Sequence, residues 1–335
     1  MNKISRPWFL TLTLSLSALA GALAASSPPA PRVVLGTTQL DGVAARLGET
    51  FTLGKASPLN FTLARAEYSL GRVVIGNTTY FPKIGEKLLL LHFTVHNPQK
   101  NDVRYYWADL NFTAVDAQDR NHVFVQAVAR EGTTERLELT LKPAQKVGVM
   151  TVIRVPAGGP VPKLLVQREA ALLRYDLRGQ VQPLPAAQAD PADPQGAAAL
   201  AQLRSQAGRF EALEAFDVRF DEARFTQDAL GGAAPKAGSR YLAAVFTLRN
   251  PLKTEQVYAW SNFKLSLKDA DGERTDAGTV MLKASRDEKA GGKLPGGEEA
   301  RVRFFFALPA SVGADSLSIT DANGRAYVYD LRTIK

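Results

Sequence analysis

The chain has 335 residues, of which 45% are hydrophobic and 22% charged, a composition typical of a globular protein long enough for two domains. It contains no cysteine, which excludes disulfide bonds, thiol chemistry, cysteine-ligated metals and a lipid-modified N-terminal cysteine. The formal net charge is +8. Apart from the first two basic residues, the excess of basic over acidic residues lies entirely in residues 25–180, which contain 19 Lys and Arg and 13 Asp and Glu. We interpret this half as a solvated basic surface. The alternative is a surface that attracts anionic envelope polymers or lipid headgroups.

Residues 1–25 predict a cleavable signal peptide. Two basic residues precede the apolar run WFLTLTLSLSALAGALA, which ends in an Ala-Leu-Ala pattern that suits signal peptidase. The alternative is an uncleaved membrane anchor, because the run approaches the length of a membrane span. We expect an exported protein, in the periplasm, in the cell envelope or secreted. It has a proline-rich spacer over 26–31, no later membrane span and no nucleic-acid partner.

Two long stretches of the sequence are similar to each other. The stretch GEKLLLLHFTVHNPQKNDVRYYWADLNFTAVDAQD, which begins at Gly85, aligns without a gap with GSRYLAAVFTLRNPLKTEQVYAWSNFKLSLKDADG, which begins at Gly238. The similarity continues beyond both stretches, and such a unit is too long for a solenoid repeat. We therefore predict two copies of one domain, over 32–180 and 205–335.

Residues 181–204 separate the two copies. The segment is rich in Pro, Ala, Asp and Gln and lacks an apolar period. This composition predicts an interdomain linker, with a short helix near 197–203.

Each copy has the period-two pattern of β-strands. Alternate apolar residues from Leu89 to Val95 lie on one face, and residues from Leu242 to Leu248 repeat the pattern. Asn-Pro ends each of these strands, and DAQD and DADG each close a later hairpin. Short strands separated by turn signals predict an all-β fold: two tandem antiparallel immunoglobulin-like β-sandwich domains from an internal duplication.

Several recurring residues suggest a family. They are Val95/Leu248, Asn97/Asn250, Asp109/Asn262, Leu110/Phe263 and Asp116/Asp269, together with Gly272. Their order resembles the immunoglobulin-like extracytoplasmic domain of bacterial envelope lipoproteins, of some telluride-resistance-associated proteins and of a mycobacterial secreted immunogen. The resemblance implies a sandwich outside the cytoplasm, largely unknown ligands and no catalytic residues. The chain departs from this pattern because it lacks the lipidated cysteine.

The three histidines raise the question of a metal site. His92 and His96 lie four residues apart, and His122 follows in a later strand. Side chains at these positions of one strand share a face but stand about 13 Å apart, whereas a metal–nitrogen bond is about 2 Å long. We therefore expect a partly exposed strand face, with a zinc or copper site of His92, His96 and His122 as the alternative.

The hairpin KDADGERTD offers oxygen ligands of the kind that calcium prefers. Its candidates are Asp269, Asp271 and Glu273. The D-x-D-G core is also what a tight turn between strands requires, and we favour the turn.

Aromatic residues recur as YYW at 105–107 and as YAW at 258–260. Recurrence in both copies favours buried anchors of the fold over a ligand platform. Tyr80, Phe81 and Tyr106 are the candidates for a ligand or partner surface.

No sequence motif of catalysis is present. The chain lacks G-x-S-x-G, H-E-x-x-H, a phosphate-binding loop and a dinucleotide-binding fingerprint. We expect no cofactor and predict a non-catalytic binding or structural protein of the cell envelope. The alternatives are a carrier of a small ligand or metal (zinc, copper or calcium) and an unrecognised hydrolase.

Overall fold

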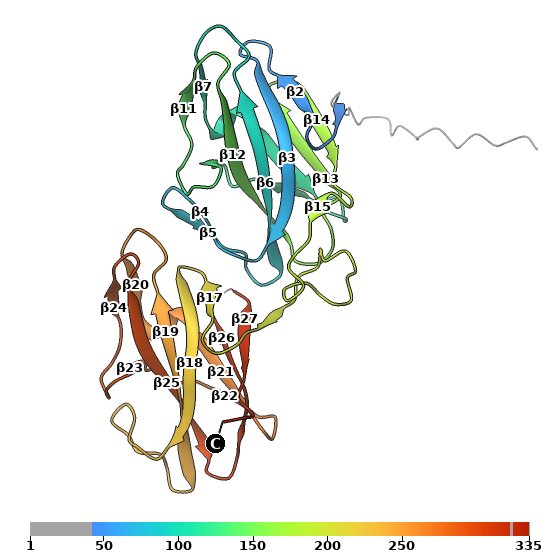
Figure 1. Ribbon diagram of the computed structural model, residues 1–335. Helices are drawn as coiled ribbons and strands as arrows, with labels where there is room; N and C mark the ends of the chain where they lie inside the picture. Colours follow the sequence, from blue (N-terminus) through green and yellow to red (C-terminus); the bar gives the residue numbers. More distant parts are fainter. Residues whose placement is uncertain (1–41, 322–323, 335) are drawn as a thin grey trace, which may run out of the picture. The chain divides into compact units, whose positions relative to one another are not determined.

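The structure is a computed structural model that describes residues 42–321 and 324–334 (Figure 1). These residues belong to one compact unit that runs from Asp41 to Lys335. The expected signal peptide and spacer lie outside the described residues. Among the described residues, no helix has the length and apolar character needed to cross a membrane.

Strands β1 to β15 pair only with one another and form what we call the first strand set. One sheet has the order β1-β14-β13-β8-β9, the other has the order β10-β12-β6-β3-β15 with β2 also on β3, and β7-β11 and β4-β5 form two-stranded ribbons. The bounds are β1 (Val43–Ala45), β2 (Thr50–Leu53), β3 (Leu59–Ser69), β4 (Val73–Ile75), β5 (Thr78–Tyr80), β6 (Glu86–His96), β7 (Val103–Tyr105), β8 (Asn111–Val115), β9 (Asn121–Val123), β10 (Ala129–Arg130), β11 (Leu139–Leu141), β12 (Lys146–Pro156), β13 (Lys163–Arg168), β14 (Ala171–Asp176) and β15 (Val181–Gln182), with the 3₁₀ helix η1 (Trp107–Asp109) between β7 and β8.

Strands β16 to β27 form the second strand set. Its sheets have the orders β16-β27-β26-β21-β22 and β17-β18-β19-β25-β23, with the ribbon β20-β24. The bounds are β16 (Gln202–Arg204), β17 (Phe210–Leu213), β18 (Phe216–Thr226), β19 (Ser239–Arg249), β20 (Gln256–Tyr258), β21 (Lys264–Asp269), β22 (Arg274–Asp276), β23 (Leu282–Lys283), β24 (Gly292–Leu294), β25 (Glu299–Pro309), β26 (Ala314–Thr320) and β27 (Ala326–Asp330), with the 3₁₀ helix η2 (Trp260–Asn262).

The two strand sets have the same strand order. The sheet β16-β27-β26-β21-β22 repeats β1-β14-β13-β8-β9, and β17-β18-β19-β25-β23 repeats β2-β3-β6-β12-β10. Nearly all pairs are antiparallel, and the short strands β1, β15 and β16 pair in parallel. The prediction of antiparallel β-sandwiches is confirmed. Among the described strands, the hairpin β4–β5 and the strand β15 have no counterpart in the second strand set.

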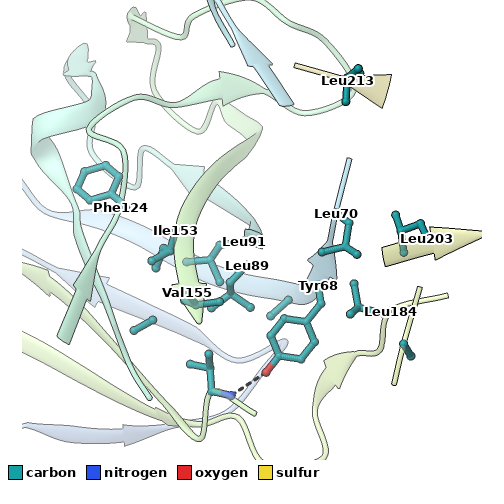
Figure 2. Close-up of a cluster of buried hydrophobic side chains, with 14 of the residues drawn as sticks. Tyr68, Leu70, Leu89, Leu91, Phe124, Ile153, Val155, Leu184, Leu203 and Leu213 are labelled. Atoms are coloured by element: carbon teal, nitrogen blue, oxygen red, sulfur yellow. Dashed lines mark hydrogen bonds between the residues drawn. The ribbon is translucent and has the colours of Figure 1, made fainter. Parts of the chain in front are cut away.

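The predicted apolar faces form the core. Alternate residues of β6 from Leu89 to Val95 are buried, as are those of β19 from Leu242 to Leu248. Figure 2 shows Leu89 and Leu91 of β6 in the buried cluster that also contains Ile153 of β12. Burial of a side chain of this size contributes roughly 1.5–3 kcal/mol, so these rows supply much of the stability of each sandwich.

A β-bulge interrupts β3 and β18 at corresponding places. The register with the neighbouring strand shifts between Leu63 and Arg65 in β3, and between Phe220 and Glu222 in β18. The extra residue turns the side chains that follow it, so Arg65 lies opposite His92 on the outer face of the sheet. In the sequence, this change of face shows only as a break in the alternation of apolar residues between Leu63 and Ala66.

The segment 181–204 is packed, and the prediction of a short helix within it is wrong. Strand β15 pairs with β3, and the residues of the expected helix are irregular up to the start of strand β16 at Gln202. Leu184 and Ala197 are buried, and the Asp193 carboxylate accepts hydrogen bonds from the backbone N–H groups of Ala197 and Ala198 at 2.8 and 2.6 Å. The composition of this segment is typical of a linker, yet its small and apolar residues are buried and hold the segment in place.

Arg72 joins the end of β3 to the turn between β17 and β18. Its guanidinium donates to Asp217 Oδ1 at 2.8 Å, to the Phe216 carbonyl at 2.6 Å and to the Glu214 carbonyl at 2.5 Å. The side chain is only 9% exposed, so this is a buried charge with its donors satisfied.

One further expectation needs correction. The aromatic stretches are not equally buried, since Tyr105 is fully buried but Trp260 is 46% exposed. In both stretches the tryptophan begins a 3₁₀ helix, which takes it out of the strand.

Candidate functional site

The hairpin β4–β5 is the clearest difference between the two strand sets. Val73 and Ile75 of the hairpin are buried against Leu88 and Leu90, which lie on the outer face of β6. Gly76 at the tip has a φ of +62°, a conformation that favours glycine. The hairpin is therefore a fixed addition to the outer face of this sheet.

Tyr80 is the last residue of the hairpin, and Phe81 follows it directly. Both are half-buried, and the guanidinium of Arg154 lies 5.7 Å from the centre of the Tyr80 ring. Phe81 lines a cleft of about 270 Å³. Tyr106 lies elsewhere, edge-on to Trp107 with ring centres 6.3 Å apart, and does not line this cleft.

Charges of both signs line this cleft, which we call the hairpin cleft. Lys83 and Arg154 come from the first strand set, and Glu214 and Asp321 come from the second part of the chain. Partial burial raises the pKa of Glu214, and the neighbouring Asp321 raises it further. The remaining lining includes the amides Asn77 and Gln256 and the apolar side chains Phe81 and Leu252.

His92 lies among three charged side chains. We call the four residues Arg65, Glu67, His92 and Glu131 the His92 cluster. The His92 ring places Nδ1 2.8 Å from Glu131 Oε1 and Nε2 3.1 Å from Glu67 Oε1. Arg65 Nη2 lies 3.0 Å from Nδ1. His92 is only 8% exposed, whereas the Arg65 and Glu131 side chains are about two-fifths exposed, at 43% and 40%.

The structure does not bring the three histidines together. His96 Nδ1 lies 3.0 Å from the Asn60 amide nitrogen, and His122 Nε2 lies 2.9 Å from Asp116 Oδ2. In the part of the chain that the structure describes, no group of three or more His, Asp or Glu side chains could hold a metal ion. Each of the three rings has a polar partner on at least one of its nitrogens.

The acidic hairpin between β21 and β22 is built as a turn. Asp269 is buried, and its Oδ1 accepts hydrogen bonds from the backbone N–H groups of Asp271 and Glu273 at 3.0 and 2.8 Å. Asp271 and Glu273 are exposed. The favoured interpretation of a turn therefore accounts for the placement of all three acidic residues.

Asp116 stabilises the turn between β8 and β9 in the same way as Asp269 stabilises its own turn. It accepts hydrogen bonds from the backbone N–H groups of Gln118 and Arg120 at 2.9 and 3.0 Å. Burial opposes the charge, yet hydrogen bonds from His122, Arg120 and Gln118 hold the pKa of Asp116 well below its usual range. His122 is thus a partner of a turn aspartate.

Sequence reasoning missed Glu67, Glu131 and Arg65. Glu67 and Glu131 lie 25 and 39 residues from His92 in the chain. No short sequence pattern relates residues that are this far apart in the chain. The only available signal was the break in alternation at Ala64, which exposes two consecutive residues of β3 on one face.

The comparisons with known proteins give similar structures and no family. No family model and no curated protein match the sequence. An uncharacterized β-sandwich protein from Clostridium difficile 630 is 16% identical, with a TM-score of 0.31, over 39% of this chain and 95% of its own. The secreted protein MPT63 from Mycobacterium tuberculosis is 15% identical, with a TM-score of 0.31, over 41% and 99%. The yjhA protein from Bacillus subtilis is 15% identical, with a TM-score of 0.29, over 37% and 97%. Similarities this weak assign neither a family nor a function.

Proposed function

We propose that this chain is an exported, non-catalytic protein of the cell envelope that binds a segment of another protein in the hairpin cleft. The observation that carries the proposal is the pair of charged walls, Lys83 and Arg154 against Glu214 and Asp321. The signal-peptide pattern and the resemblance to extracytoplasmic immunoglobulin-like domains support export.

The mixed lining favours a peptide segment over an anionic polymer or a lipid headgroup. A polyanion would be attracted to Lys83 and Arg154 but repelled by Glu214 and Asp321 in the same cleft. A peptide can present both signs of charge, backbone groups for Asn77 and an apolar side chain beside Phe81. Protein interfaces combine aromatic anchors with polar rims in this way.

The surroundings of the histidines support a role without catalysis. The partners of His92 are Glu67, Glu131 and Arg65, and none of them is a hydroxyl or amine nucleophile. His122 is bound to Asp116 of a turn. General base catalysis needs an imidazole within hydrogen-bond reach of the group that it deprotonates.

Crosslinking in producing cells tests the proposal. A photo-crosslinking amino acid replaces Phe81 in the full chain, and in a matched control it replaces Val123, which is 59% exposed on β9. We expect one discrete protein adduct from position 81 and none from position 123. The double variant Lys83→Glu/Arg154→Glu should reduce this adduct about tenfold, as expected for the loss of roughly 1.4 kcal/mol of binding. The matched double variant Lys100→Glu/Lys146→Glu, whose lysines are exposed and do not line the cleft, should keep the adduct.

Three outcomes would refute the proposal. The first is a chain recovered without any adduct at position 81. The second is an adduct with lipid or polymer only. The third is an adduct that both double variants leave unchanged.

A further inference from the structure

One edge of the second strand set is open where the corresponding edge of the first is covered. Strand β17 pairs with β18 only as far as Arg219, and just beyond it the Gly208 N–H donates to the Phe220 carbonyl at 2.8 Å. In the described part of the chain, no strand pairs with this edge of β18 over residues 221–226. A strand edge without a neighbour presents unpaired backbone N–H and C=O groups, to which another strand can bind.

Strand β15 covers the corresponding edge of β3 in the first strand set (Figure 1). It runs parallel to β3 and pairs with Ala66 and Glu67. Ala66 is fully buried, and the nearby Tyr68 is only 6% exposed. Figure 2 shows Tyr68 in the buried cluster together with Leu184, which follows β15 in the chain. The covered edge is therefore part of the core.

The open edge leaves two core positions of β18 partly exposed. Counted from the bulge in each strand, Ala66 of β3 corresponds to Ala223 of β18, and Tyr68 corresponds to Phe225. Ala223 and Phe225 pack against the core but are only partly buried. A strand added to this edge would therefore bury apolar surface in addition to forming backbone hydrogen bonds.

Two exposed charges of opposite sign lie on the outer face of the open edge. Glu222 and Arg224 are two residues apart on β18, so their side chains share one face of the sheet. Glu222 has one long contact, at 3.7 Å from Arg301, and Arg224 has no ion pair within the described residues. The corresponding residues of the first strand set, Arg65 and Glu67, pair with each other at 3.6 Å. The two charges of the open edge are thus available to a partner.

We propose that two copies of this chain form a dimer through antiparallel pairing of their open β18 edges. With Ala223 on the twofold axis, Glu222 of each copy lies directly opposite Arg224 of the other, so two ion pairs form across the axis. An axis at either charged residue would place two like charges opposite each other, and so would parallel pairing in register. Like charges in directly opposite positions are destabilising, so the charges select one register.

The dimer leaves the hairpin cleft free. None of the residues 220–226 lines that cleft. The pairing joins the two copies of the sheet β17-β18-β19-β25-β23 into one continuous sheet. The dimer stands on the open edge and its charges, whatever partner the hairpin cleft binds.

Sedimentation equilibrium of the mature chain, without any ligand, tests the dimer. The wild type should associate to a dimer as its concentration is raised. Glu222→Arg and Arg224→Glu should each weaken the dimer at least about tenfold, because each change replaces both ion pairs across the axis with pairs of like charge. A mixture of the two variants should associate with about the wild-type affinity, because one copy then presents only basic and the other only acidic side chains at these positions.

A matched control separates this contact from a general effect of charge. Arg274→Glu reverses an exposed charge on β22, the edge strand of the other sheet, and should keep the wild-type dimer. Circular dichroism confirms that each variant folds, as expected for changes at exposed positions. The proposal is overturned if the wild type stays monomeric, if either Glu222→Arg or Arg224→Glu keeps the wild-type affinity, or if their mixture does not associate. It is also overturned if Arg274→Glu weakens the dimer as much as Arg224→Glu does.

Discussion

Asn97 and Asn250, which lie 153 residues apart, make the same three hydrogen bonds. Asn97 Nδ2 donates to the carbonyls of Asn101 and Leu141 at 2.8 and 3.0 Å, and Asn250 Nδ2 donates to those of Thr254 and Leu294 at 2.8 and 2.9 Å. Each Oδ1 accepts a backbone N–H two residues further on, at 2.9 and 3.0 Å. Both side chains are fully buried, and each ties the end of a core strand to a neighbouring ribbon.

Replacing either asparagine by alanine should destabilise its own strand set. The change leaves the buried carbonyl of Leu141 or Leu294 without this partner, together with a second, less buried carbonyl and one N–H. An unsatisfied buried group costs about 1–3 kcal/mol. Urea unfolding of Asn97→Ala and Asn250→Ala measures the loss. Asn101→Ala serves as the control, because the Asn101 side chain is exposed and only its carbonyl takes part. A loss below about 0.5 kcal/mol in both variants, as for an ordinary surface substitution, would contradict this role.

The repeated residues show what the sequence could predict. Asn97, Asp116 and their counterparts perform local turn chemistry, and local chemistry is visible in a short pattern. The bulge at Ala64 left only one signal, a break in the apolar alternation, and that break does not identify the charged residues on the neighbouring strands. The packing of Leu184 was missed because composition describes the average behaviour of a segment and not the burial of single residues.

The charged groups at the two bulges show why the candidate site could not be predicted. In the second strand set, Asp221 at the bulge accepts hydrogen bonds from Arg219, Thr247 and Arg301 at 2.7, 2.7 and 3.1 Å. Val245 occupies the place of His92 in the aligned repeat. The same backbone feature therefore carries two different sets of charges. Repeat similarity predicts the backbone, and the side chains upon it come from strands that only the fold brings together.

Lys87 should make stability rise with pH above neutrality. It is fully buried, and its Nζ donates to the carbonyls of Gly159, Ala197 and Ala157 at 2.6, 2.5 and 3.2 Å. Burial lowers the pKa of Lys87 to about 8, whereas an unfolded lysine has a pKa of about 10.4. Between these values the unfolded chain binds more protons than the folded one, so the free energy of unfolding increases with pH.

Lys87→Met removes this contribution and provides the measurement. The difference in unfolding free energy between wild type and Lys87→Met should grow in favour of the wild type by about 2 kcal/mol from pH 7.5 to 10. This is less than the full pKa shift implies, because the range ends below the pKa of the unfolded lysine. Guanidinium unfolding at several pH values measures it. A difference that stays constant over this range would show that the buried amine titrates normally.

Buried tyrosines should limit stability at still higher pH. Burial raises the pKa of five of the nine tyrosines, namely Tyr68, Tyr105, Tyr175, Tyr327 and Tyr329. The unfolded chain loses these protons near the ordinary tyrosine pKa of about 10, before the folded chain does. Stability is therefore intact below pH 10 and falls above it. Absorbance at the tyrosinate band should show that these five tyrosines ionise only on unfolding. Titration of all nine before loss of the circular dichroism signal would be inconsistent with this burial.

Arg72 should couple the unfolding of the two strand sets. Its ion pair with Asp217 is largely buried, at 9% and 12% side-chain exposure, and removing one partner of such a pair typically costs about 3 kcal/mol or more. Arg249 Nη2 also donates to Asp217 Oδ2 at 2.8 Å. In Arg72→Ala the carboxylate therefore keeps one partner, which limits the loss of stability in the second strand set.

The strands of each set pair only with one another, so a chain without Arg72 should unfold in two calorimetric transitions where the wild type shows one. Arg104→Ala, which removes an exposed ion pair with Glu138, should keep a single transition. If Arg72→Ala unfolds like the wild type in shape and midpoint, the two strand sets are coupled by other contacts, and Arg72 contributes little to them.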